Sequence, residues 1–325
     1  MGLKSYVIRR LGQIGVTYFV FLCILFVMFR LIPGDPTSRF ILSGMSAEGR
    51  QQLIRELGLN EPLHIQFITY VQNLLTGELG MSFTYREPVW DVVVVKFWNT
   101  IFLMGTALLL AFAIGISVGA LLGWFRGSRF ENVGIVATLM ARSSPEFLTG
   151  IFVLMIFVFW LGWFPPGGMR APSAVVTGFW DRYFAWDFIY HAALPVITAT
   201  IYYSTLPILL MRNSMLDVLK SDFVEIKKAE GIAPSRILYK HVVRNSILPI
   251  VTLMATASGL AIGGSIIIET VFSWPGMGRE MLLAVRNNDY PLAMGLFYFM
   301  GVVVIFMNFL ADIAYVYLDP RVEYE

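Results

Sequence analysis

Residues that could carry out catalysis or hold a metal are few and widely separated in this sequence. His64, His191 and His241 have no partner at metal-ligand spacing, and Cys23 is the one cysteine. No G-x-x-x-x-G-K-[ST] phosphate loop, H-E-x-x-H motif or Ser/His/Asp arrangement occurs. The sequence therefore predicts a chain that is not an enzyme by itself, with no cofactor and no metal site.

Charged residues inside or beside long apolar runs are the next candidates, because charge at membrane depth is costly and usually functional. Arg30 and Glu269 lie near the ends of such runs, so we expect both to anchor the ends of spans by reaching toward water. Arg142 precedes "SSPEF", where Pro145 lacks a backbone donor and predicts a kink. Asp312 lies in the last apolar run.

A basic segment, "EIKKAEGIAPSRILYKHVVRNSILP" (225–249), interrupts two apolar runs. Good helix formers precede Gly231, which suits a left-handed turn, and Pro234 suits the first turn of a second helix. In that second helix the apolar residues can share one face while the basic residues point away. The apolar residues are Ile237, Leu238 and Val242, and the basic residues are Arg236, Lys240 and Arg244.

This predicted helix, glycine turn and second helix has two interpretations. A basic amphipathic loop can rest on anionic lipid, which accounts for the positive charge. A rigid projection that docks into another protein also accounts for the short helix that Gly231 and Pro234 set apart.

Composition places the chain in the membrane class. Hydrophobic residues make up 57% and charged residues 14%, and the net charge of +2 gives no support for nucleic-acid binding. Six apolar runs are long enough to cross a bilayer, and "ARSSPEF" interrupts the third of them. They lie at about 11–32, 100–124, 133–163, 192–211, 247–268 and 292–317. "GLAIGGSIII", within the fifth, predicts close helix approach.

Basic residues in the short loops predict the orientation, because cytoplasmic loops carry an excess of Lys and Arg. They place both termini and a segment of about 212–246 in the cytoplasm, and a long segment of about 33–99 outside. That outer segment contains a predicted amphipathic helix with one apolar face, formed by Phe67, Val71, Leu74 and Leu75. We expect one all-α membrane domain over 1–325.

The basic segment resembles the cytoplasmic coupling motif, or EAA loop, of ABC importer permeases of the dipeptide/oligopeptide type. Matching positions are Ala229, Gly231, Arg236, His241, Arg244, Asn245, Leu248 and Pro249. Lys227 stands where Ala is usual and Glu230 where Lys is usual, which leaves open the partner surface that the helix fits. "FRLIPGDP", "LGLNEPLHIQF", "HAALPVITATI", "ETVFSWPGMGRE" and "DPRV" are similar to the family in the same order.

The resemblance implies a type I ABC importer-like permease with six transmembrane helices in the inner membrane of a prokaryote. Its implied partners are a second homologous permease, two ATPase subunits that bind ATP, and an extracytoplasmic substrate-binding protein. We expect coupling to the ATPase through Glu225, Ala229, Gly231, Arg236 and Arg244. Candidates for the translocation path are Arg142, Ser144, Pro145, Gly263 and Gly264.

Alternatives remain for the substrate and for the class of transporter. Members of the family carry peptides, oligosaccharides or metal chelates. An ion-gradient-driven secondary transporter would need broken helices or paired acidic residues at the midplane and an inverted repeat. A membrane-embedded enzyme would need a catalytic cluster, which we do not find in this sequence.

Overall fold

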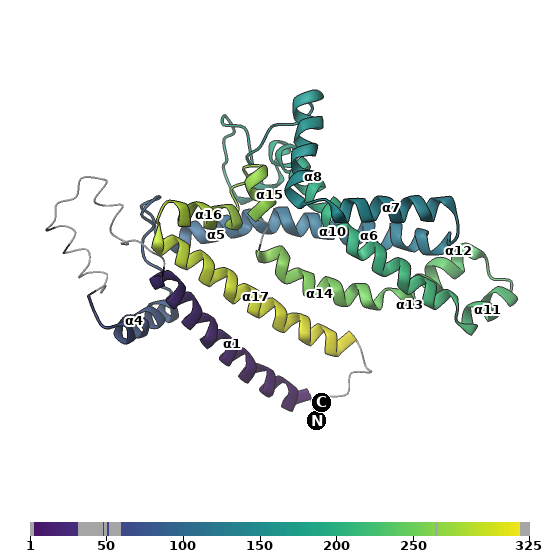
Figure 1. The fold of residues 1–325 in the computed structure, drawn as a ribbon, viewed down its shortest axis with the longest axis horizontal. Helices are drawn as coiled ribbons and strands as arrows, with labels where there is room; N and C mark the ends of the chain where they lie inside the picture. The colour runs from purple at the N-terminus through teal and green to yellow at the C-terminus, as the bar shows by residue number, and fades with distance from the viewer. Residues whose placement is uncertain (1–2, 32–47, 49–50, 52–59, 264–265, 319–325) are drawn as a thin grey trace. The chain divides into compact units, whose positions relative to one another are not determined.

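The computed structural model describes residues 3–31, 48, 51, 60–263 and 266–318. Regular structure in this part of the chain is helical, and its one β pairing is an isolated bridge between Met81 and Pro88 (Figure 1). The predicted all-α class is therefore confirmed.

Helices of the first half follow one another with short connections. They are α1 (Leu3–Leu31), α4 (Leu63–Thr76), α5 (Val89–Thr100), the π-helix η1 (Ile101–Gly105), α6 (Thr106–Trp124), α7 (Arg129–Ser143), α8 (Glu146–Leu154) and the π-helix η2 (Met155–Trp160).

The second half begins with a short helix and then the longest helix described. Its elements are α9 (Phe179–Phe184), α10 (Trp186–Leu219), α11 (Asp222–Ala229), α12 (Pro234–Arg236), the π-helix η3 (Ile237–Val243), α13 (Arg244–Ser246), α14 (Leu248–Gly263), α15 (Ile266–Val271), α16 (Met277–Arg286) and α17 (Tyr290–Leu318).

Four described helices are long and apolar enough to cross a membrane: Arg9–Leu31, Val89–Trp124, Trp186–Leu219 and Tyr290–Leu310. The pair Arg129–Ser143 and Glu146–Trp160 adds a fifth if it forms one span, although it bends by 102° at its break. The run expected at 247–268 corresponds to α14 and α15, and positions 264–265 between them lie outside the described residues. The count of six spans stays a prediction.

Contacts divide the chain into two compact units. One contains residues 1–97, 280–305 and 324–325, and the other contains residues 98–279 and 306–323. In the first unit α4 is the amphipathic helix that the sequence predicts: Leu74 is buried, whereas Leu75 is 73% exposed and does not belong to the packed face. The Phe67 ring packs edge-to-face against Phe26 of α1.

The centre of the larger unit is the contact between α6 and α10, which run side by side in Figure 1. Gly115, Gly119 and Gly123 are spaced by four residues and therefore share one face of α6. A Cβ atom added at Gly119 would lie 2.5 Å from the Ile208 carbonyl oxygen and 2.7 Å from the Met211 Cβ. The glycine row thus lets the two backbones approach closely, as small residues do in membrane helix pairs.

The row on α6 was not predicted, and the glycine-rich run on α14 does not show comparable crowding where it is described. A Cβ atom at Gly259 would meet Asn308 at 3.5 Å, which is an ordinary contact. Gly264 lies outside the described residues.

We predict that Gly119→Ala lowers the free energy of unfolding by about 2 kcal/mol, because overpacking a close helix contact costs about 1–3 kcal/mol. Gly105→Ala is the matched control, since a Cβ atom there would meet nothing within 4 Å. Thermal melting of the purified chain in detergent compares the two variants. A Gly119→Ala melting temperature at or above that of the unchanged chain would contradict the prediction.

Candidate functional site

The basic segment folds as the sequence predicts, into a helix, a glycine turn and a second helix (Figure 1). α11 ends at Ala229, and Gly231 then adopts a left-handed conformation with φ of 72°. Pro234 begins α12, which continues without a break into η3 and α13. Figure 1 shows α11 and α12 together at one end of the α6–α10 pair.

This two-helix segment is packed as a rigid piece onto α10. Its apolar residues Val224, Ile237, Leu238 and Val242 are buried in the same core cluster as Met211 and Met215 of α10. The Ser214 hydroxyl of α10 also donates to the Ser246 carbonyl of α13 (2.8 Å). We therefore expect the segment and the long helix to move together.

All five predicted coupling residues are exposed on the described chain: Glu225, Ala229, Gly231, Arg236 and Arg244. A cleft of about 750 Å³ lies beside the segment, with Glu225 in its wall. Its other charged lining residues are basic and come from the ends of three elements. They are Arg126, Lys220 and Lys228. The cleft therefore has an excess of positive charge.

A partly buried ion pair supports the base of this segment. The Arg212 Nε and Nη2 atoms donate to Glu131 Oε1 at 3.0 and 2.5 Å, and the Glu131 side chain is only 5% exposed. The second carboxylate oxygen accepts from the Gly127 backbone N–H (2.5 Å). Arg212 is a good helix former, and α10 continues through it to Leu219, beyond the predicted end of the apolar run at 211.

Sequence reasoning missed this pair, although a local signal was present. Ser128 caps α7 by accepting from the Glu131 backbone N–H (3.2 Å), so "SRFE" has the spacing of a capping box. The signal marks the start of α7 and places Glu131 in its first turn. It does not reveal Arg212, which is distant in sequence and meets Glu131 only through the packing of α7 against α10.

The path candidates Arg142, Ser144 and Pro145 lie at the break between α7 and α8. Ser144 is extended (φ −73°, ψ 129°), Pro145 precedes the first turn of α8, and the helices bend by 102° there. The predicted interruption at Pro145 is confirmed, as a sharp break rather than a gentle kink. The Arg142 guanidinium lies 5.8 Å from the centre of the Tyr202 ring on α10. Gly263 ends α14, and Gly264 lies outside the described residues.

The expectation for Glu269 was wrong, because this side chain is fully buried and does not anchor a span end in water. The Thr100 hydroxyl donates to its Oε1 atom (2.6 Å), and the Arg279 backbone N–H donates to Oε2 (2.8 Å). A Cβ atom at Gly276 would lie 2.3 Å from Oε1, so only glycine fits against this carboxylate. The "ETVFSWPGMGRE" run (269–280) therefore folds around the buried Glu269 carboxylate, and we call this cluster of hydrogen bonds the polar core.

Asn99 completes this polar core. Its Oδ1 atom accepts from the Tyr183 hydroxyl (2.9 Å), and its carbonyl accepts from the Trp274 indole N–H (3.0 Å). Burial raises the pKa of Tyr183, which keeps the hydroxyl neutral and able to donate. These contacts hold the start of the η1–α6 span against the turn that precedes α16.

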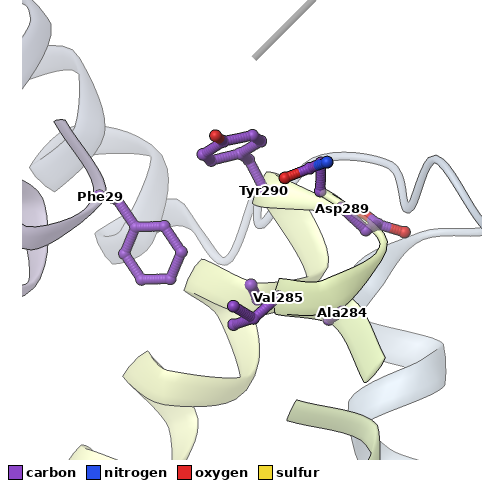
Figure 2. A pocket seen from close by; sticks show the side chains of 7 residues that line it. Phe29, Ala284, Val285, Asp289 and Tyr290 are labelled. Atoms are coloured by element: carbon purple, nitrogen blue, oxygen red, sulfur yellow. The ribbon is translucent and has the colours of Figure 1, made fainter. Parts of the chain in front are cut away.

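A small cavity beside α16 and α17, shown in Figure 2, is too small for a solute. Its volume is about 20 Å³, room for about one water molecule. Phe29, Ala284, Val285, Asp289 and Tyr290 line it. Asp289 is itself satisfied by the Ser82 hydroxyl (2.7 Å) and the Thr84 backbone N–H (2.8 Å).

Comparisons with known proteins cover nearly the whole chain. The family described as binding-protein-dependent transport system inner membrane component matches residues 113–324, and its N-terminal part matches residues 3–104. A putative peptide permease protein of Brucella suis is 37% identical over 322 residues, 98% of each chain. The di/tripeptide transport system permease protein DppB of Pseudomonas aeruginosa is 32% identical over 99% of each chain.

Two further relatives extend the comparison. The oligopeptide transport system permease protein AppB of Bacillus subtilis is 31% identical over 99% of this chain and 100% of its own. A solved structure of the MetNI methionine ABC transporter in inward-facing conformations has a TM-score of 0.56 at 15% identity. It covers 71% of this chain and 97% of the matched chain, and it shows a shared fold.

We predict that Arg212→Ala lowers the free energy of unfolding by about 3 kcal/mol, because it leaves the buried Glu131 carboxylate without its cation. Lys227→Ala is the control: its ion pair with Glu230 (2.7 Å) joins side chains that are 32% and 46% exposed, and such pairs contribute about 0–1 kcal/mol. Thermal melting in detergent measures both. Equal decreases in melting temperature for the two variants would show that the burial of Glu131 adds nothing to the stability that the ion pair provides.

Proposed function

We propose that this chain, which belongs to the family of binding-protein-dependent transport system inner membrane components, carries peptides and uses its α11–α13 segment to receive the movement of an ATPase. The chain is the permease subunit of an ABC importer and is not itself the ATPase. This excludes the secondary-transporter and membrane-enzyme alternatives.

The observation that carries the coupling proposal is the two-helix segment on its rigid base. One side of the segment is buried on α10, and the five predicted coupling residues are exposed. An element that is fixed on one side and free on the other can transmit a partner's closure as a rigid-body movement. A segment that only rested on lipid would not need this firm attachment to the long helix.

Each coupling residue has a proposed part in docking. Glu225 offers a hydrogen-bond acceptor, and Ala229 allows close approach because its side chain is small. Gly231 supplies the left-handed turn that sets α11 apart. Arg236 and Arg244 add positive charge, as do the basic residues of the cleft, so we expect the ATPase to present acidic groups there.

The proposed assembly contains a second homologous permease, two ATPase subunits that bind ATP, and an extracytoplasmic substrate-binding protein. The family description supports the binding protein, because it names a binding-protein-dependent transport system. The bilayer surrounds the spans, and no nucleic acid takes part. We propose alternating access, with half of the path formed by this chain.

The proposed path includes the break at Arg142, Ser144 and Pro145. A 102° bend between two helices leaves backbone groups free of helical hydrogen bonds, which is tolerated at membrane depth where the backbone lines a cavity or contacts protein. Gly263 and Gly264 belong to the same proposal on sequence grounds alone.

A peptide substrate is supported by the relatives, since three of them are named as permeases for peptides, di/tripeptides or oligopeptides. Oligosaccharides and metal chelates are the alternatives that a transport assay must exclude. The chain is a multi-pass protein of the inner membrane. We further propose that both termini and the α11–α13 segment face the cytoplasm.

For the coupling role, we expect Gly231→Val and Ala229→Trp to reduce substrate-stimulated ATP hydrolysis and peptide uptake together, roughly fivefold or more. A left-handed backbone costs a β-branched residue about 1–2 kcal/mol, and an indole at position 229 would overfill a close contact. Both activities are measured on the reconstituted transporter.

Gly231→Asn is the matched control, because Asn tolerates the left-handed conformation and a Cβ atom at Gly231 would meet nothing within 4 Å. We expect it to keep most activity. Normal assembly and wild-type coupled hydrolysis with Ala229→Trp would show that this face of α11 touches no partner. A greater effect from neutralising Lys227 and Lys228 would favour the lipid-surface interpretation.

For the orientation, a single cysteine is placed at an exposed position on each side, after Cys23→Ser removes the native thiol. We expect Gln72→Cys to react with a membrane-impermeant maleimide in spheroplasts, and Ser235→Cys to react only after permeabilisation. The opposite pattern would overturn both the orientation and the coupling role.

A further inference from the structure

A groove with both polar and apolar lining runs along α4 in the smaller unit, at the end of α1 that is predicted to face outside. Its volume is about 490 Å³. The helix contributes a row of polar residues at the spacing of one helical face: Gln66, Thr69, Tyr70 and Asn73. Arg30, Glu61 and Glu78 add charge, and Pro291 and Met294 of α17 supply apolar wall.

Arg30 is held in this groove by an aromatic ring. Its guanidinium carbon lies 5.3 Å from the centre of the Phe26 ring, and it forms no hydrogen bond or ion pair with any described residue. A guanidinium held by its face keeps its in-plane N–H donors available for a carboxylate. Phe26 also packs against Phe67 and Tyr70, which places Arg30 beside the middle of α4.

Two carboxylates flank the groove because of the way α4 begins and ends. Glu61 precedes the first turn, and its carbonyl accepts from the Gln66 side chain (2.6 Å). Glu78 follows the last turn, where Gly77 (φ 80°) lets the Glu78 N–H bond to the Asn73 carbonyl (2.8 Å). Arg30 lies beside the middle of α4 and the two carboxylates lie at its ends, so they are separated along the helix by about half its length, about 10 Å at 1.5 Å per residue. A peptide of three extended residues, at about 3.3–3.6 Å each, spans that distance.

We infer that the α4 groove binds short zwitterionic peptides, with Arg30 on the peptide carboxylate and Glu61 or Glu78 on its ammonium group. The amide side chain of Asn73, which lines the groove, would bond the peptide backbone. The inference rests on the proposed peptide substrate and adds a site of contact on the permease itself, apart from the helix break proposed as the path.

The test measures binding of trialanine to the full-length chain in phosphatidylcholine nanodiscs by calorimetry. We expect Arg30→Gln to weaken binding at least tenfold and Arg30→Lys to restore part of it, because the lysine keeps the charge but not the bidentate geometry. Asn73→Ala, which removes one side-chain hydrogen bond, should weaken binding by roughly three- to tenfold. Acetylated and amidated trialanine, which lacks both charges, should not bind measurably.

Arg129→Gln, an exposed arginine of α7, is the control variant and should bind as the unchanged chain does. Melting temperatures verify that each variant is folded. Equal binding by Arg30→Gln and the unchanged chain would overturn the inference, as would equal binding of the capped peptide. Arg30-dependent retention of phosphatidylethanolamine that displaces trialanine would overturn it in favour of a lipid headgroup.

Peptide uptake by the assembled transporter separates this inference from the proposed function. Uptake by a transporter whose permease does not bind trialanine would refute the groove and leave the function standing. Arg30-dependent binding without peptide uptake would support the groove and refute the function.

Discussion

The close approach of α6 and α10 is the constraint on which the larger unit depends. Membrane helices gain little from apolar burial against each other, since lipid tails are equally apolar, so their association relies on close packing. Gly115, Gly119 and Gly123 provide that packing against Pro207, Ile208 and Met215. A side chain at any of these three positions would push the helices apart. It would also shift the C-terminal end of α10, on which the α11–α13 segment packs.

The α11–α13 segment, for which we propose the coupling role, gains its stiffness from this arrangement. Its apolar residues join the core of α10, and Glu131 and Arg212 bond α7 to α10 just before the segment begins. An interface of packed side chains and buried charge has discrete arrangements and does not deform continuously, so it can pass on a partner's movement. Under the proposed function, the contact that stabilises the helix pair would also serve coupling to the ATPase.

Buried carboxylates in both units are satisfied by hydrogen bonds. Glu269 accepts from Thr100 and Arg279, and Asp289 accepts from Ser82 and Thr84. Burial without such partners would cost several kcal/mol for each charge. The α4 groove differs, because the Arg30 guanidinium lies over a ring face and has no hydrogen-bond or ion-pair partner among the described residues. That contrast is the reason why we regard the groove as a binding site.

The sequence by itself determined the all-α membrane class, the break at Pro145, and the helix–turn–helix segment with Gly231 in a left-handed turn. These features follow from local chemistry: apolar length, a missing backbone donor, and a residue without a Cβ atom. Only the tertiary structure decided that Glu269 is buried, that Arg212 meets Glu131, and that the glycine row of α6 is the tight one. Each of these depends on which residues distant in sequence become neighbours, and spacing along one chain does not contain that information.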